Sequence, residues 1–204
     1  MADFEIFEPE IYLLDDRKYS QQVSRYISNF RRGILMDHKP LFFLLLGSYA
    51  EKSGKVFVLS EEERISYKSI LILLNKIKQD IQDIQDYSIL ITPHIFTKVA
   101  NDLRKRINDP KHFKGIVEMI LDNFPFVKEE EIKKEEILGF ANFKNMHCGI
   151  SETAIVIMKN RIGRVGVIAY SDKIPAVCGE DYLFVDFKSL VSTIKEFERR
   201  EEIN

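Results

Sequence analysis

The sequence has few cysteines and almost no excess of charge, and each lack excludes a class of protein. Only Cys148 and Cys178 occur among the 204 residues, with no Cys-x-x-Cys pair and no Cys/His zinc spacing. This usage is typical of free thiols in a reducing cytosol. The formal net charge is −2, from 30 basic and 32 acidic residues. The chain therefore lacks the net positive charge that is typical of proteins binding nucleic acid, although a local basic patch is compatible with this net charge.

Long apolar runs are also missing. The longest, Leu41 to Leu46, is far shorter than the roughly 20 residues that a membrane-spanning helix needs. The opening residues, Met-Ala-Asp-Phe-Glu, are acidic and do not follow the pattern of a signal peptide. The sequence therefore predicts a cytoplasmic protein without a membrane segment.

The stretch from Gly33 to Gly47 carries the clearest local pattern. A short apolar run, Ile34 to Met36, is followed at once by Asp37, and Pro40 opens a second apolar run. This order predicts a buried strand, an acid at its carboxyl end, and a helix with proline in its first position. Since ligands of open α/β sheets bind outside the carboxyl ends of the strands, Asp37 stands where chemistry is expected.

Strands and helices alternate along the rest of the chain. Further strands are predicted at Tyr87–Ile91, Arg164–Tyr170 and Tyr182–Val185. Apolar residues at helical spacing predict seven helices. Three have both ends indicated: about 15–32, Thr92 to Ile107, and about 111–123. The other four are indicated by their starts, at Pro40, after the capping box Ser60–Glu63, near Ser151, and after Asp186. The charged run 127–136 is predicted to be a solvated helix face, because Glu129 and Lys133 have the spacing of a helical ion pair.

This alternation predicts an α/β fold, specifically a three-layer α/β/α sandwich with a mostly parallel central sheet. No linker rich in Pro, Gly or Ser divides the chain. We therefore expect a single domain over 1–204, with an N-terminal extension containing a helix at 1–32, a core at 33–198 and a charged tail at 199–204.

Three acids stand at matching points of this scheme. Asp37 follows the first strand, Glu152 lies in the first turn of a helix, and Asp172 follows the strand that ends at Tyr170. Carboxylates gathered at one sheet edge suit Mg²⁺, and a metal there can activate water for attack on a phosphodiester. Each acid also has a structural interpretation, as a helix cap, as a partner of a helix dipole and as a loop acid respectively.

Four motifs in this order resemble those of the PIN domain, a family of metal-dependent nucleases that act mostly on RNA. They are Ile34-Leu-Met-Asp37-His-Lys-Pro-Leu41, Ile91-Thr-Pro-His-Ile-Phe-Thr-Lys98-Val-Ala-Asn101, Cys148-Gly-Ile-Ser-Glu152-Thr-Ala-Ile155 and Ala169-Tyr-Ser-Asp172-Lys173. The resemblance implies a PIN-like endoribonuclease in which Asp37, Glu152 and Asp172 hold Mg²⁺ or Mn²⁺ and a bound water attacks RNA. It also suggests a toxin-like role with an antitoxin or other protein partner, and a homodimer.

Two residues depart from the family pattern. Glu152 stands where the family usually has Asp and keeps a carboxylate. Lys98 stands where the family usually has a metal-coordinating Glu, and an ammonium cannot bind a cation. Its ammonium either replaces the metal, contacts a substrate phosphate beside a metal held by the three acids, or pairs with Asp102 at i, i+4 spacing. Asn101 is a candidate for orienting the acids, and Ser171 for holding a metal-bound water.

Lys98 therefore leaves two functions open. The first is a metal-dependent endoribonuclease. The second is a degenerate, non-catalytic PIN-like protein that binds RNA or a protein partner, with Lys98 in place of the metal.

Overall fold

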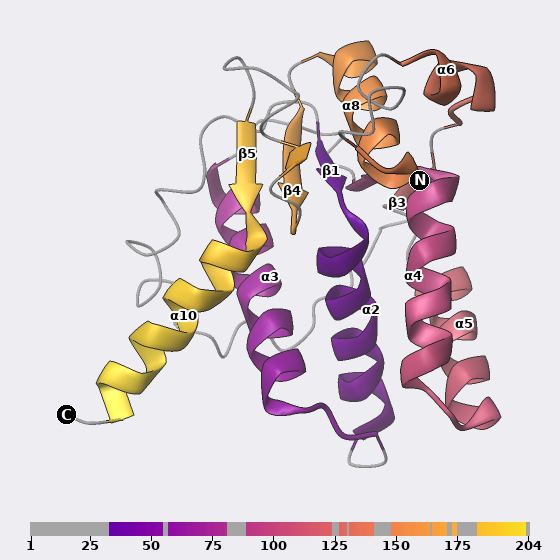
Figure 1. Ribbon diagram of the computed structural model, residues 1–204. Coiled ribbons are helices and arrows are strands. Elements are labelled where there is room, and N and C mark those ends of the chain that lie inside the picture. Colours follow the sequence, from indigo (N-terminus) through magenta and orange to yellow (C-terminus); the bar gives the residue numbers. More distant parts are fainter. Residues whose placement is uncertain are drawn as a thin grey trace, which may run out of the picture.

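The structure is a computed structural model in which helices surround a small central sheet (Figure 1). It describes residues 33–54, 57–80, 89–123, 127–129, 131–140, 148–163, 165–170, 173–174 and 183–202. The helix predicted over about 15–32 lies outside the described residues.

Five strands form one sheet in the order β3-β2-β1-β4-β5. They are β1 (Ile34–Met36), β2 (Ile89–Ile91), β3 (Val127–Glu129), β4 (Gly166–Ala169) and β5 (Leu183–Asp186). All four neighbouring pairs are parallel. The first of these strands is the central one, since Ile34 pairs with Ile89 on one side and with Gly166 on the other.

Both faces of this sheet are covered. Successive side chains of a strand point to opposite faces, yet every residue of β1, β2 and β4 is buried. Strands of this kind consist of apolar residues without alternation, as in Ile34-Leu-Met and Ile89-Leu-Ile. The α/β class and the parallel sheet predicted from the sequence are confirmed.

The helices of the described residues form two groups. They are α2 (His38–Ser53), α3 (Glu61–Asp80), α4 (Pro93–Arg106), α5 (Pro110–Asn123), α6 (Lys134–Gly139), α8 (Ile150–Ile162) and α10 (Phe187–Glu202). In the first group α2 packs between α3 and α4, and α10 packs on α3 (Figure 1). In the second, α8 contacts α6 and β1, and it also touches α4 of the first group. None of the described helices is both long and apolar enough to cross a membrane.

The strand order explains this grouping. The connections from β1 to β2 and from β2 to β3 run in one direction across the sheet, whereas the connection from β3 to β4 runs back in the other. Because such parallel connections are right-handed, the reversal assigns α8 to the face opposite α2, α3, α4 and α5. The arrangement is compatible with the predicted three-layer α/β/α sandwich.

The prediction of a helix over 127–136 is wrong. Val127–Glu129 forms β3, which pairs with β2, and the helix of this region starts only at Lys134. In the described sheet β3 is an edge strand, which pairs through its backbone with β2. The predicted helical pairing of Glu129 with Lys133 is therefore also wrong.

Two predicted helix starts also need correction. The N-cap of α2 is Asp37 and its first residue is His38, so Pro40 is third rather than first. Proline is tolerated there because the N–H groups of the first turn have no partner within the helix. The N-cap of α8 is Gly149 and not Ser151.

Three predicted caps are confirmed. Glu63 and Ser60 form a reciprocal capping box at the start of α3, with Ser60 N–H donating to Glu63 Oε2 at 2.7 Å and Glu63 N–H to Ser60 Oγ at 3.3 Å. The Thr92 side chain accepts from Ile95 N–H at the start of α4. Asp186 accepts from the backbone of the first turn of α10.

Candidate functional site

The strand order places a ligand site next to β1. From β1 the chain proceeds to β2 and β3 on one side of the sheet, and later to β4 and β5 on the other. Ligands of open α/β sheets bind at this point of reversal, outside the carboxyl ends of the strands. Asp37 directly follows β1 and Tyr170 directly follows β4, so both residues stand at the point where a ligand is expected.

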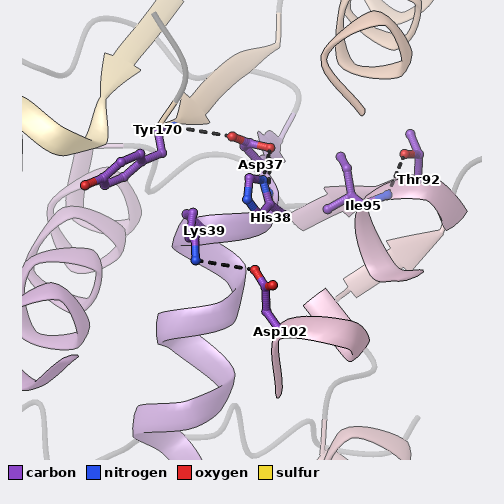
Figure 2. Close-up of polar contacts among 7 residues, drawn as sticks. All are labelled: Asp37, His38, Lys39, Thr92, Ile95, Asp102 and Tyr170. Carbon is purple, nitrogen blue, oxygen red and sulfur yellow. Dashed lines mark hydrogen bonds and ion pairs between the residues drawn. The ribbon is translucent and has the colours of Figure 1, made fainter. Parts of the chain in front are cut away.

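Asp37 is fully buried and held from three directions (Figure 2). Its backbone N–H donates to Ile168 O at 2.9 Å, which extends the pairing of β1 with β4. Carboxylate Oδ1 accepts from the backbone N–H of His38 at 2.7 Å and from the ring Nδ1 of His38 at 2.9 Å. Oδ2 accepts one long hydrogen bond, from Tyr170 N–H at 3.4 Å. Oδ1 thus has two donors, whereas Oδ2 has a single long hydrogen bond within the part of the chain that the structure describes.

The Asp37 carboxyl is ionised despite its burial. Burial alone raises the pKa of an acid, because the charged form is poorly solvated inside a protein. The hydrogen bonds and positive charge of His38, joined by the positive charge of Lys98, outweigh burial and hold the pKa of Asp37 below its ordinary range. The site is therefore a buried negative charge that is stabilised by the hydrogen bonds of His38 and by the positive charge of Lys98.

The Asp37 carboxylate also fixes the ring of His38. An ionised carboxylate only accepts hydrogen bonds, so Nδ1 must carry the proton that is shared between them. The imidazole then presents Nε2 as its second polar atom, and the His38 side chain is only 11% exposed. An oriented imidazole of this kind can accept or donate a proton, or bind a polar group of a ligand.

Lys98 lies on α4, partly buried, with its charge acting on Asp37. Among the described residues no hydrogen bond or ion pair joins Lys98 to Asp37, so Lys98 acts on the carboxylate through its charge alone. The pairing of Lys98 with Asp102 is not the one found, because Asp102 Oδ2 lies 3.4 Å from Nζ of Lys39, on the neighbouring helix α2 (Figure 2).

Glu152 lies in the first turn of α8, as predicted. Its carboxylate folds back over the start of its own helix, so that a Cβ on Gly149 would lie 2.7 Å from Glu152 Oε2. Its charge also helps to raise the pKa of the buried Cys148 thiol, after the larger effect of burial. Within the described residues no hydrogen bond or ion pair joins Glu152 to Asp37 or Lys98. The contacts seen are those of an acid that stabilises a helix N-terminus.

The remaining predicted residues fall into two cases. Asn101 is exposed on α4, and no hydrogen bond joins it to Asp37 in the described part of the chain. Ser171 and Asp172 lie outside the described residues. Among the residues that are described, no three His, Cys, Asp or Glu side chains come together as a metal site.

Two further residues of the motifs, Tyr170 and His94, have features that the sequence did not predict. Tyr170 binds Asp37 through its backbone and has a side chain that is 38% exposed. His94, one turn before Lys98 on α4, has a buried Nδ1 without a hydrogen-bond partner among the described residues. The signal for Tyr170 was an aromatic residue directly after a buried strand, inside the fourth motif.

Comparison with known proteins gives no match, since no family model, no curated protein and no solved structure is significantly similar to this chain.

Proposed function

We propose that this chain is a PIN-like protein that binds RNA at the sheet edge around Asp37, with the Lys98 ammonium in place of a metal. The observation that carries the proposal is the ionised, fully buried carboxylate of Asp37 at the point where the strand order reverses. A buried charge of this kind is costly unless it is compensated, and sites that retain one are commonly functional. RNA enters the proposal through the resemblance of the four motifs.

The charge balance of the site favours binding over catalysis. Mg²⁺ needs oxygen ligands, and the second motif offers an ammonium where a carboxylate would be required. Oδ1 of Asp37 is engaged by His38, and Lys98 already acts on the carboxylate as a positive charge. The same ammonium is suited to receive an RNA phosphate without a metal.

The second candidate function is a Mg²⁺- or Mn²⁺-dependent endoribonuclease that uses Asp37, Glu152 and Asp172. The observation that favours it is Oδ2 of Asp37, whose only hydrogen bond in the described part of the chain spans 3.4 Å. A hard cation can use an oxygen of this kind. A bound cation would supply an activated water and stabilise the charge of the phosphodiester displacement.

Metal-dependent melting separates these two functions. A cation that binds only the folded chain at about ten times its Kd adds about 1.4 kcal/mol, which raises the Tm by roughly 3–6 °C. We expect no such rise for the wild-type protein with Mn²⁺, and a rise for Lys98→Glu, which restores a carboxylate. Lys105→Glu is the matched control, because Lys105 is an exposed lysine of the same helix.

Binding and cleavage of single-stranded RNA complete the test. We expect the wild-type protein to bind RNA without cleaving it, and Lys98→Glu to lose affinity in the absence of metal while Lys105→Glu loses less. A Tm rise of the wild-type protein with Mn²⁺, together with RNA cleavage, would establish the endoribonuclease. If the wild-type protein does not bind RNA at all, both functions are excluded.

A further inference from the structure

His94, the second residue of α4, contains a polar atom that the described fold leaves unsatisfied. Its Nδ1 is buried and has no hydrogen-bond partner in the part of the chain that the structure describes. A buried polar atom without a partner destabilises the folded state, and such atoms are rare in proteins. An apolar side chain at this position would avoid that cost, so the imidazole indicates a role other than packing.

The burial of Nδ1 also determines where the neutral ring carries its proton. A neutral imidazole has one N–H group and one nitrogen that can only accept. A buried N–H group without an acceptor is rarer in proteins than a buried acceptor without a donor, so the proton is placed on Nε2. The side chain of His94 is partly exposed, and the buried Nδ1 is not its exposed atom. His94 therefore presents an N–H donor towards the surface.

Lys98 lies one turn further along the same face of α4. Side chains at i and i+4 of a helix are neighbours, with about 5–6 Å between their Cβ atoms. Both His94 and Lys98 are partly exposed. The oxygens of one ligand group can therefore accept from an imidazole N–H and from an ammonium at the same time.

This pair of donors lies at the same edge of the sheet as Asp37. The register of β1 and β2 sets the N-caps of α2 and α4, Asp37 and Thr92, at equivalent positions two residues beyond the last paired residues. The two helices pack together, and the charge of Lys98 acts on the Asp37 carboxylate. Because part of the positive charge of Lys98 compensates Asp37, a phosphate at this edge needs a further donor.

The neighbouring donors of α2 are already engaged. Nζ of Lys39 lies 3.4 Å from Asp102 Oδ2. The ring of His38 shares its Nδ1 proton with the Asp37 carboxylate. Nε2 of His94, in contrast, is a donor that no described residue uses.

We infer that His94 donates through Nε2 to the RNA phosphodiester that Lys98 contacts, so that the two side chains hold one phosphate between them. The inference rests on the proposed binding of RNA at this edge of the sheet. It adds a second ligand of the phosphate, which contributes a directed hydrogen bond where Lys98 contributes charge. The unsatisfied Nδ1 is then a cost in stability that accompanies a binding residue.

The first test measures binding of fluorescently labelled oligouridine to the full chain by anisotropy at about pH 8, where an imidazole is ordinarily neutral. His94→Leu should weaken binding roughly tenfold or more, as the loss of a hydrogen bond to a charged group does. His94→Gln should recover most of this loss, because its amide N–H can take the place of Nε2–H. Asn108→Leu is the matched control, since Asn108 is a neutral, exposed residue beyond the far end of α4.

The salt dependence of binding separates the hydrogen bond of His94 from the charge of Lys98. Lys98→Gln should lower the slope of log affinity against log salt by about 0.7, the contribution of one phosphate contact on a single strand. His94→Leu should leave the slope unchanged, because a neutral donor displaces no counterion. An equal fall in the slope for His94→Leu would show that the ring binds as a cation, against this inference.

Thermal melting separates a binding role of His94 from a structural one. Leucine replaces the unpaired nitrogen by apolar atoms, so His94→Leu should melt at or above the wild-type Tm although it binds RNA more weakly. A Tm several degrees below that of the wild-type protein would show that the ring is retained for stability, and the inference would be wrong.

NMR of the wild-type protein gives a result that depends on no variant being folded. Long-range ¹H–¹⁵N spectra at about pH 8 should show the proton of His94 on Nε2. The same Nε2 signal should shift when oligouridine is added. A proton on Nδ1, or an Nε2 signal that ignores bound RNA, would overturn the inference.

The outcomes also distinguish this inference from the function on which it rests. If the wild-type protein binds RNA and Lys98→Glu weakens that binding, but His94→Leu binds as Asn108→Leu does, His94 is not a phosphate ligand and the proposed function stands. If the wild-type protein does not bind RNA, the proposed function fails and this inference fails with it.

Discussion

Gly47 of α2 faces the ring of Tyr67 of α3 so closely that a Cβ on Gly47 would lie 2.1 Å from Tyr67 Cγ. Glycine inside a helix costs about 1 kcal/mol relative to alanine, and this contact explains why it is found there. The Tyr67 hydroxyl donates to Glu51 Oε2 at 2.8 Å, which holds the ring over the glycine. The close approach of α2 and α3 thus depends on one missing side chain.

Gly47→Ala should therefore destabilise the fold although alanine is the better helix former. The new methyl group has to displace a buried ring near its attachment point, and overpacking of this kind costs about 1–3 kcal/mol. Thermal melting should show a Tm several degrees below that of the wild-type protein. Gly139→Ala is the control, since no atom lies within 4 Å of a Cβ at that position. Equal Tm values for the two variants would contradict the close packing of α2 on α3.

Glu63 predicts a specific loss of stability in acid. Burial raises the pKa of its carboxyl, but the hydrogen bonds from Arg106 and Ser60 outweigh burial and hold the pKa below its ordinary range. The ionised form is thus favoured by folding, and this contribution is complete above the ordinary Glu pKa of about 4.3. It is lost as the pH falls through the lower pKa of the folded state.

The variant Glu63→Gln should accordingly differ most from the wild-type protein near neutral pH. Its Tm should be lower there, and the difference should shrink when the pH falls below about 4. Glu62→Gln, which changes the exposed neighbour, should track the wild-type protein at every pH. A constant difference between Glu63→Gln and the wild-type protein would show that the pairing with Arg106 does not depend on charge.

Asp37→Asn tests whether the buried carboxylate stabilises the fold. A lowered pKa means that folding favours the ionised form over the neutral one. The neutral amide also gives up charge-assisted hydrogen bonds from His38, which are worth about 1.5–3 kcal/mol each. We expect a Tm lower by roughly 3–12 °C in thermal melts at pH 7.

Asp102→Asn is the matched control for that measurement. Its carboxylate pairs with Lys39 in a partly exposed position, where ion pairs contribute about 0–1 kcal/mol. If Asp37→Asn melted at or above the wild-type Tm, the carboxylate would be retained for binding at the expense of stability.

Thr92→Ala should weaken the start of α4, the helix that carries Lys98. Thr92 is fully buried, and its hydroxyl accepts from Ile95 N–H at 3.4 Å (Figure 2). Loss of such an N-cap costs about 1 kcal/mol. Thr97→Ala, in the same helix, removes an exposed hydroxyl that donates to Pro93 O, and its Tm should stay close to that of the wild-type protein. A Thr92→Ser variant should recover most of the loss.

Features that depend on residues close together in the sequence were predicted correctly, whereas features that depend on distant residues were not. The central strand β1 and the caps at Ser60, Thr92 and Asp186 are set by neighbouring residues, and the sequence indicates them correctly. β3 was missed because Val127-Lys-Glu has no pattern of its own and becomes a strand only through its backbone pairing with β2. Short edge strands of charged residues give no periodic signal.

The same distinction applies to the site. The position of Asp37 at a strand end was predictable, but its bond to Tyr170 needs the pairing of β1 with β4, which are far apart in the sequence. The i, i+4 rule predicted that Asp102 pairs with Lys98, because the rule takes into account residues of the same helix and not those of neighbouring helices. Packing of α2 against α4 brings in Lys39 instead.

The central place of β1 also has a consequence for synthesis of the chain. Ile34 leaves the ribosome long before Gly166, its partner in β4. Until then Asp37 has neither Ile168 O nor Tyr170 N–H to hold it. A nascent or truncated chain that ends before β4 therefore lacks these two contacts of Asp37, and the edge of β1 that pairs with β4 stays open to other chains.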